Sequence, residues 1–169
     1  VLVAQKVLSA EDAEKVRRAQ KVNGFTAEQA VLQLGIASEA QIAQALAAHA
    51  GLPYVKINPL DLDLDVVTKA IAGPFARRHG MVAIAKNGDR ITIAVHNPFA
   101  PFPFEDVKRV TGCEIDRVVA TRSDVETVNK GFYDLKSSLK HAEKQLSESR
   151  IATVDLGNQG FLSKADADL

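Results

Sequence analysis

"MVAIAKNGDRITIAV", which runs from Met81 to Val95, is the clearest structural signal in this sequence. Two apolar runs, residues 81–85 and 90–95, flank the tripeptide Asn87-Gly88-Asp89. Apolar runs joined in this way are typical of a β-hairpin, because Asn-Gly can supply the positive φ angles of a tight turn. The stretch therefore predicts two antiparallel strands in the middle of the chain.

Further elements are predicted on both sides of the hairpin. Pro74 fits the first turn of a helix, Gly112 fits a helix C-terminus, and Ser123-Asp-Val-Glu126 has the spacing of a capping box. In chain order we expect a strand, two helices, the hairpin, a helix, a strand and a closing helix: 54–57, 64–72, 74–79, 81–95, 104–111, 114–120 and 123–133. Residues 53–133 are therefore predicted to form a small mixed α+β domain with a three- to four-stranded sheet.

Residues 1–52 carry helix signals instead. Ser9, Thr26 and Ser38 each have the character of an N-cap, and glycines mark the helix ends. Three short helices are expected, at 10–23, 27–34 and 39–50. The predicted fold class is therefore α+β, with a helical subdomain (1–52) ahead of the mixed domain (53–133). Residues 134–169 are predicted to be a helical linker and tail, loosely held from 151 onward.

Composition narrows the function classes. The 169 residues include 21 Lys plus Arg and 21 Asp plus Glu, so the formal net charge is zero. A neutral chain does not favour nucleic-acid binding, which depends on neutralising phosphates. The single cysteine suits a reducing cytoplasm, and neither a bilayer-spanning run nor a signal peptide is found. Because the chain starts at Val1, we interpret it as part of a longer protein.

No catalytic or metal-binding constellation is found in the sequence. Asp61-Leu-Asp-Leu-Asp65 is similar to the start of a calcium loop, but Val66 and Ala72 replace the required glycine and glutamate. The four histidines are scattered, and Cys113 has no local histidine partner. Gly157-Asn-Gln-Gly160 lacks the spacing of a phosphate loop. We therefore predict no catalytic residue, no metal ligand and no cofactor-binding loop in this chain.

One loop is rich in aromatic rings. The segment "HNPFAPFPF", residues 96–104, contains three phenylalanines and three prolines. Prolines hold the backbone extended, and the rings can either cover the domain's own core or dock a partner. We expect the loop to cover the core, with an exposed partner patch as the alternative.

The helical segment contains a repeat. "LVAQKVLSAEDAEKVRRAQ", residues 2–20, and "VLQLGIASEAQIAQALAAHAG", residues 31–51, share one spacing and start 29 residues apart. Each has an aliphatic pair, a second pair five residues later, a serine and then a helix-like run. Two packed helical hairpins would explain the repeat, and so would one ligand held between two copies of a motif.

The repeat resembles the MshEN module, which forms the N-terminal region of many type II secretion and type IV pilus assembly ATPases. The family motif has Arg-Leu-Gly, two aliphatic pairs with a glycine between them, two leucines and a glutamine. In nucleotide-binding members its two copies hold cyclic di-GMP. The segments "AVHNP" and "VNKGFYD" are also similar to the secretion ATPase N-terminal domain. The resemblance covers residues 1–133.

The match to the motif is degenerate. Lys6 stands where the first copy should have glycine, Thr26-Ala27-Glu28 replaces Arg-Leu-Gly in the second, and His49 replaces glutamine. Glu28 puts an anion near a dianionic ligand, which disfavours binding. We therefore favour a scaffold role over retained cyclic di-GMP binding. The residues that would form the site are Leu2, Val3, Val7, Leu8, Gln20, Val31, Leu32, Gly35, Ile36, Leu46 and His49.

The resemblance implies a docking and regulatory role, most simply in a GspE-like secretion ATPase. The expected partners are the inner-membrane platform protein, GspL-like or its pilus equivalent, and the protein's own ATPase domain. The longer protein is expected to bind ATP and Mg²⁺, to form a homohexamer and to lie in the cytoplasm against the inner membrane. The alternatives are a cyclic di-GMP receptor domain of a PilB-like ATPase and a module fused to a different kind of protein.

Overall fold

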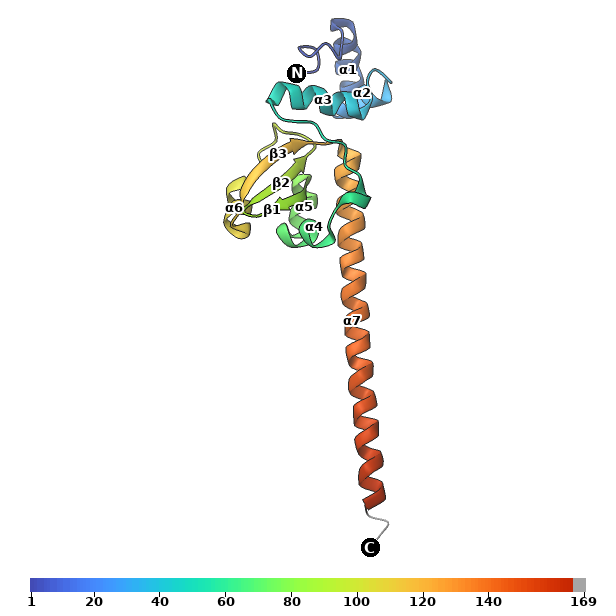
Figure 1. The fold of residues 1–169 in the computed structure, drawn as a ribbon. Coiled ribbons are helices and arrows are strands. Elements are labelled where there is room, and N and C mark those ends of the chain that lie inside the picture. The colour runs from blue at the N-terminus through green and yellow to red at the C-terminus, as the bar shows by residue number, and fades with distance from the viewer. Residues whose placement is uncertain (166–169) are drawn as a thin grey trace. The chain divides into compact units, whose positions relative to one another are not determined.

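The computed structural model describes the backbone of residues 1–165 and the side chains of residues 1–150 (Figure 1). Its fold is α+β, as predicted. The elements in chain order are α1 (Ala10–Asn23), α2 (Ala27–Gln33), α3 (Glu39–Ala50), a 3₁₀ turn (Pro59–Asp61), α4 (Leu64–Ala70), α5 (Gly73–His79), β1 (Met81–Asn87), β2 (Arg90–Val95), α6 (Phe104–Thr111), β3 (Glu114–Val119) and α7 (Arg122–Ala165). We call residues 1–52 the helical half and residues 53–132 the sheet half.

The three helices of the helical half begin at the predicted caps. The side chains of Ser9, Thr26 and Ser38 each accept a hydrogen bond from the backbone N–H three residues on. The side chain at that third position bonds back to the cap's own N–H, so each start is a complete capping box. The helix starts were predictable because these contacts are local in sequence.

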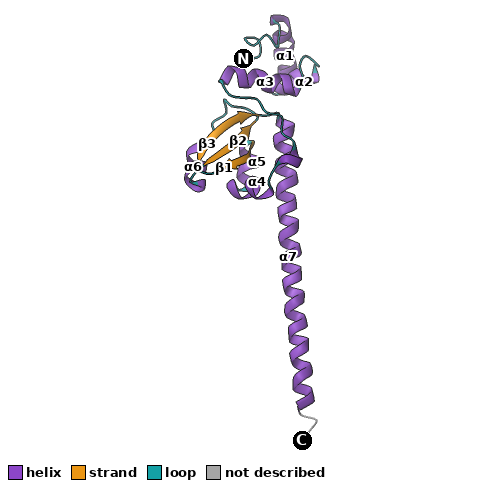
Figure 2. Ribbon diagram, viewed as in Figure 1, coloured by secondary structure: helices purple, strands orange, loops and turns teal. Residues whose placement is uncertain are grey.

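The sheet is mixed and three-stranded (Figure 2). β1 and β2 are antiparallel, as the hairpin signal predicts, and β3 runs parallel to β2 after the crossover through α6. Asn87 pairs with Arg90, so the turn is the dipeptide Gly88-Asp89. Positive φ occurs at Gly88 but not at Asn87 or Asp89, which is the pattern of a type II′ turn. Gly88, rather than an Asn-Gly pair, therefore supplies the required conformation.

One part of the core of the sheet half is a row of side chains that crosses the three strands. Val82, Ala94 and Val118 are paired across the three strands and are buried together. Val67 of α4 and Val125 of α7 pack on this row and are fully buried. Removing such aliphatic side chains from water contributes about 1.5–3 kcal/mol each, so α4 and the first turns of α7 are fixed on the sheet.

The predicted strand at 54–57 is wrong. Tyr54 forms only an isolated bridge with Val119. Two hydrogen bonds of 2.8 Å, from Val55 N to Val119 O and from Val119 N to Pro53 O, tie the segment to β3. Pro53 has no N–H and Pro59 opens a 3₁₀ turn, so the pairing does not extend into a ladder.

The closing helix differs from its prediction at both ends. α7 begins at Arg122, and the backbone N–H of Asp124 donates to Thr121 Oγ1 at 3.1 Å. Thr121 is thus the cap, while the Ser123 hydroxyl contacts the Glu39 carboxylate. The helix continues past Tyr133 to Ala165, and residues 166–169 lie outside the described part. The loose attachment expected from 151 onward stays a prediction. A boundary between two compact units falls within α7, after Phe132.

The helical half packs on the sheet half through small side chains. Ala43 and Ala47 of α3 are buried against Val119 of β3, with Leu52 and Tyr54 beside them. Alanines allow a helix to approach closely, because they add almost no bulk between the two backbones. This contact brings the helical repeat next to the start of α7.

Candidate ligand site between the repeat copies

The two copies of the repeat have the same backbone geometry. Lys6 (φ 57°) and Gly35 (φ 63°) occupy the same motif position, and both are in the left-handed conformation. Each donates its N–H to the carbonyl three residues back, Lys6 to Val3 and Gly35 to Leu32, at 3.0 Å in both copies. Both copies of the repeat therefore form the same structure, a turn that ends in a left-handed residue and is followed by a capped helix.

Most of the predicted motif residues build the core of the helical half. Leu8, Val16, Ala30, Val31, Ala37 and Ile42 are buried together. Motif residues Leu2, Val7, Leu32, Ile36 and Leu46 pack against this cluster and are partly buried. Helix packing therefore accounts for most of the aliphatic pairs, whereas Val3 is 47% exposed.

A pocket of about 530 Å³ nevertheless lies between the two copies. Four predicted motif residues line it: Leu2, Val3, Leu8 and Leu46. Thr26, Ala27 and Glu28, the residues that replace Arg-Leu-Gly, line it as well, together with Val1, Ile42, Asn97 and Arg122. We call this cavity the repeat pocket. The structure does not bring the other predicted residues to its wall: Val7, Gln20, Val31, Leu32, Gly35, Ile36 and His49.

An ion pair crosses the repeat pocket. Glu28 Oε2 accepts hydrogen bonds from Arg122 Nη2 at 2.7 Å and Nε at 3.1 Å. The bond to Glu28 raises the pKa of Arg122, so the guanidinium stays charged. The Glu28 carboxylate holds the guanidinium at the place where a phosphate could otherwise bind it. An anionic ligand entering this pocket must therefore displace Glu28 or accept its repulsion.

No sequence pattern points to Arg122 or Asn97 as pocket residues, because both belong to the sheet half and reach the pocket only through the fold. Arg122 lies in the first turn of α7. A cation in the first turn of a helix opposes the helix dipole, and here Glu28 and Glu126 offset it, with Glu126 Oε1 at 3.9 Å from Nη1. The charge of Arg122 at the helix start is thus balanced by one long-range and one local carboxylate.

The aromatic loop reaches both halves. The rings of Phe99 and His49 are 5.6 Å apart in an edge arrangement, which links the loop to the end of α3. The ring centroids of Phe102 and Phe104 are 5.5 Å apart. The Arg117 guanidinium lies 5.2 Å from the Phe104 ring centroid. Phe99 remains about half exposed. The loop thus contacts both halves and leaves the Phe99 ring accessible, while its expected role in covering the core stays a prediction.

The aspartate run has local structural roles. Asp63 caps α4 by accepting from the N–H groups of Asp65 and Val66, and Asp61 accepts from the Asn58 amide at 2.9 Å. Asp65 pairs with Lys69 at 2.8 Å. Each of the three carboxylates thus interacts with residues close to it in the sequence, and these local contacts account for the aspartate run.

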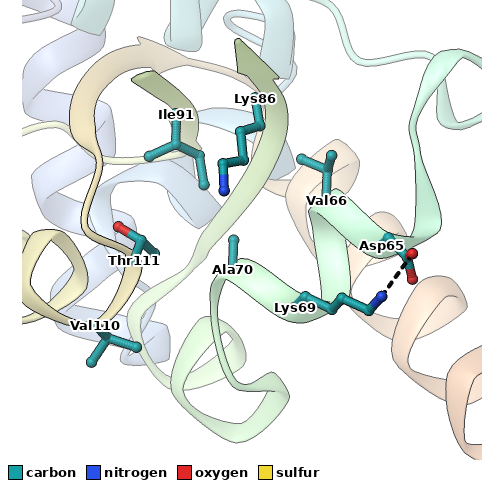
Figure 3. A pocket seen from close by; sticks show the side chains of 8 residues that line it. All are labelled: Asp65, Val66, Lys69, Ala70, Lys86, Ile91, Val110 and Thr111. Carbon is teal, nitrogen blue, oxygen red and sulfur yellow. Dashed lines mark hydrogen bonds and ion pairs between the residues drawn. The ribbon is translucent and has the colours of Figure 1, made fainter. Parts of the chain in front are cut away.

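Figure 3 shows the pocket beside this ion pair, a cavity of about 370 Å³. Lys69 turns toward Asp65, and Lys86 of β1 extends over Ala70 (Figure 3). The Thr111 hydroxyl donates to the Val107 carbonyl at 2.8 Å. Since the polar groups Lys69 and Thr111 already have partners, this cavity is a weaker candidate than the repeat pocket.

The fold is similar to that of two solved structures. The fold matches the solved structure of MshE with cdg, cyclic di-GMP, with a TM-score of 0.62 and 26% identity, over 78% of this chain and 95% of that one. It also matches the N-terminal domain of XpsE, with a TM-score of 0.55 and 20% identity, over 76% and 88% of the two chains. The molecule therefore has the fold of an N-terminal domain of this class of secretion and pilus proteins.

The family follows from the sequence itself. The profile of the MshEN domain matches residues 50–139, so this chain belongs to the MshEN domain family. The match lies mainly on the sheet half, while the repeat lies ahead of it. The chain is also 24% identical over 133 residues to the type IV pilus assembly ATPase PilB of Myxococcus xanthus (strain DK1622). It spans only 23% of the length of that relative.

A further structural fact concerns membranes. Among the residues that the structure describes, no helix combines the length and the apolar character required to cross a bilayer.

Proposed function

We propose that this chain is the N-terminal docking and regulatory domain of an ATPase that drives type IV pilus assembly or type II secretion. The observation that carries the proposal is the MshEN fold, which this chain shares along nearly the whole of the matched MshE structure. In the longer protein it would couple an ATP- and Mg²⁺-dependent homohexameric motor to the inner-membrane platform, from the cytoplasmic side. The curated PilB relative favours the pilus branch over the GspE-like branch.

The proposed partner is the cytoplasmic domain of the platform protein, GspL-like in secretion or its pilus equivalent. The helical half exposes large aliphatic side chains that the fold does not use, among them Val22 of α1 (78% exposed) and Leu34 after α2 (46%). Exposed aliphatic groups of this kind are suited to a protein contact. They are the positions at which a charge should disturb docking with little effect on the fold.

Biolayer interferometry with the immobilised platform domain tests the proposal. The unmodified chain should bind, and Val22→Glu or Leu34→Glu should weaken binding at least about tenfold, equivalent to about 1.4 kcal/mol. Val110→Glu on α6, where the side chain is 81% exposed in the sheet half, is the matched control and should bind normally. Failure of the unmodified chain to bind platform domains of both systems would refute the docking role.

A second function, cyclic di-GMP binding, is favoured by the position of the repeat pocket. Most of its wall is aliphatic and comes from both copies, and a matching structure was solved with cyclic di-GMP. Glu28 and Thr26 are the unfavourable residues. Calorimetric titration of cyclic di-GMP tests this function: saturable binding to the natural chain would support it, and no binding would eliminate it. Glu28→Gly should increase the affinity by removing a carboxylate. Thr26 is left unchanged because it caps α2.

A further inference from the structure

A second, larger cavity lies in the sheet half and is strongly basic. Its volume is about 720 Å³, within the range of small-molecule sites. Its wall includes Arg77 and Arg78 of α5, and Arg122 and Lys130 of α7. Among the described residues that line it, Glu126 is the only carboxylate. We call this cavity the basic pocket, and its charge indicates an anionic occupant.

Two of these cations are not paired with an acid. Neither Arg78 nor Lys130 forms an ion pair or side-chain hydrogen bond with any described residue, and both side chains are exposed. Arg122 differs, because it is already bound to Glu28. The pocket therefore offers two uncommitted positive charges on opposite helices, α5 and α7.

A buried acceptor without a partner also lines the basic pocket. Asn129 is 2% exposed, and its Nδ2 donates to the Met81 carbonyl at 3.1 Å. That bond fixes the orientation of the amide, since a carbonyl can only accept. Asn129 Oδ1 then receives no hydrogen bond from any described residue. A buried acceptor left unmatched is costly, so its presence at a pocket wall indicates a ligand group that donates.

His96 provides a second polar group of the same kind. A side chain at position 80 would place its Cβ 2.2 Å from His96 Nε2, so Gly80 leaves the space in which the imidazole packs. Burial and the nearby Arg122 guanidinium lower the pKa of His96, which keeps the ring neutral at pH 7. Its Nδ1 is buried and has no partner among the described residues. A neutral imidazole can donate from one nitrogen and accept at the other.

Apolar residues also line the basic pocket. They are Ala100, Pro101 and Phe102 of the aromatic loop and Val125 of α7. An inorganic anion would not cover this apolar surface. It would also leave Asn129 Oδ1 and His96 Nδ1 without hydrogen-bond partners. An acidic peptide would be expected to pair with a sheet edge or lie in a helix-binding groove, whereas no residue of β1, β2 or β3 lines the pocket.

We propose that the basic pocket binds a nucleoside phosphate. The phosphate would bind Arg78 and Lys130, the ring would lie against Phe102 and Pro101, and a ring amine or ribose hydroxyl would donate to Asn129 Oδ1. This site is separate from the repeat pocket and does not depend on the docking role. Arg122 lines both cavities, so a phosphate in the basic pocket would compete with Glu28 for its guanidinium.

Titration with ADP, followed by ¹⁵N NMR of the complete chain, tests the proposal. Amide signals of residues 77–80, 96–102 and 125–130 should shift with one saturable dissociation constant. Arg78→Ala and Lys130→Ala should each raise that constant about tenfold, the effect of about 1.4 kcal/mol. Arg109→Ala on α6 is the matched control, because Arg109 is exposed, pairs with Asp106 and lies outside the pocket. Preserved spectra of the variants would show that they remain folded.

Other probes decide the ligand class. Pyrophosphate that binds as tightly as ADP would overturn the nucleoside part of the proposal, because the ring would then contribute nothing. A hexaglutamate peptide that binds more tightly than ADP would overturn it in favour of an acidic protein segment. No shifts at about 10 mM ADP, or shifts confined to the repeat-pocket residues Leu2, Leu8 and Leu46, would also refute it.

Discussion

Lys6 adopts a left-handed backbone conformation, which is usual for glycine and unfavourable for lysine. It is the one non-glycine residue with positive φ in the part of the chain that the structure describes. A left-handed conformation costs an L-residue about 1–2 kcal/mol, and Gly35 avoids this cost at the matching position of the second copy. Lys6 therefore carries strain that the repeat geometry imposes.

Lys6→Gly should stabilise the chain by about 1 kcal/mol, because relief of the strain exceeds the added entropy of the unfolded chain. Gly35→Ala should have the opposite effect, of about 1 kcal/mol, although a Cβ there would meet no atom within 4 Å. Urea unfolding measures both changes. Gly131→Ala is the control, since Gly131 is helical with equally open space and should gain about 0.5–1 kcal/mol. Destabilisation by Lys6→Gly would contradict the strain argument.

His96 should make stability fall in mild acid. Burial first, and then the Arg122 charge, hold its folded pKa below the ordinary 6.5, while Glu28 and Glu126 partly oppose this. Between the folded pKa and 6.5 the unfolded chain binds more protons at this residue, so the free energy of unfolding falls as pH falls through that window. The stability is fully present above pH 6.5.

Urea midpoints at pH 7.5 and pH 5.5 test this prediction. The loss of stability on acidification should be smaller in His96→Gln than in the natural chain, whatever the absolute stability of the variant. Because only the change between the two pH values is compared, any stability that His96→Gln loses at both pH values through poorer packing against Gly80 cancels. An equal loss in both proteins would show that His96 does not contribute.

At the scale of the elements, local signals predicted most helices and failed where pairing partners matter. The capping boxes at Ser9, Thr26 and Ser38 involve residues three apart, so the sequence alone determines them. The strand expected at 54–57 needed a ladder with β3, and Pro53 limits that ladder to an isolated bridge. The capping box predicted at Ser123 does not form, because the Ser123 hydroxyl donates to the carboxylate of Glu39 in another helix.

Thr121→Ala should destabilise the sheet half by about 1 kcal/mol, the usual effect of removing an N-cap. Thr121 is buried and its hydroxyl accepts from Asp124 N, so neither water nor another described side chain replaces it readily. Thr121→Ser keeps the oxygen and should restore most of the loss. Thermal unfolding followed by circular dichroism measures the change.

Ser123→Ala is the matched control for the cap. It removes the contact with Glu39 at an exposed position but leaves the start of α7 capped. Its effect should be clearly smaller than that of Thr121→Ala. If Ser123→Ala proved the more destabilising, the cap would be Ser123, as its capping-box spacing predicts.

At the scale of the whole molecule, the Glu28–Arg122 pair joins residues 94 positions apart and ties the helical half to the sheet half. Both side chains are partly exposed, so solvent screens their attraction and we expect a coupling of about 0.5–1 kcal/mol. A double-mutant cycle of Glu28→Gln and Arg122→Gln measures it by urea unfolding. The coupling should decrease in 1 M salt.

The exposed pair Asp106–Arg109 within α6 provides the comparison. Because these side chains are three residues apart on one helix, their coupling should be smaller, about 0.2–0.5 kcal/mol. A Glu28–Arg122 coupling no larger than this would mean that the two halves are held mainly by their other contacts, such as the packing of Ala43 and Ala47 on Val119.

The sequence by itself determined what depends on near neighbours: the hairpin at 81–95, the three capped helices, the α+β class and the 29-residue repeat. Tertiary structure alone decided the two pockets. It placed Arg122 beside Glu28 and brought Arg78 and Lys130 to one cavity. Helix starts and turns are set by contacts a few residues apart, which a sequence displays directly. A site built from α5, α7 and the loop at 96–102 depends on how helices pack on the sheet, and no local pattern records that packing.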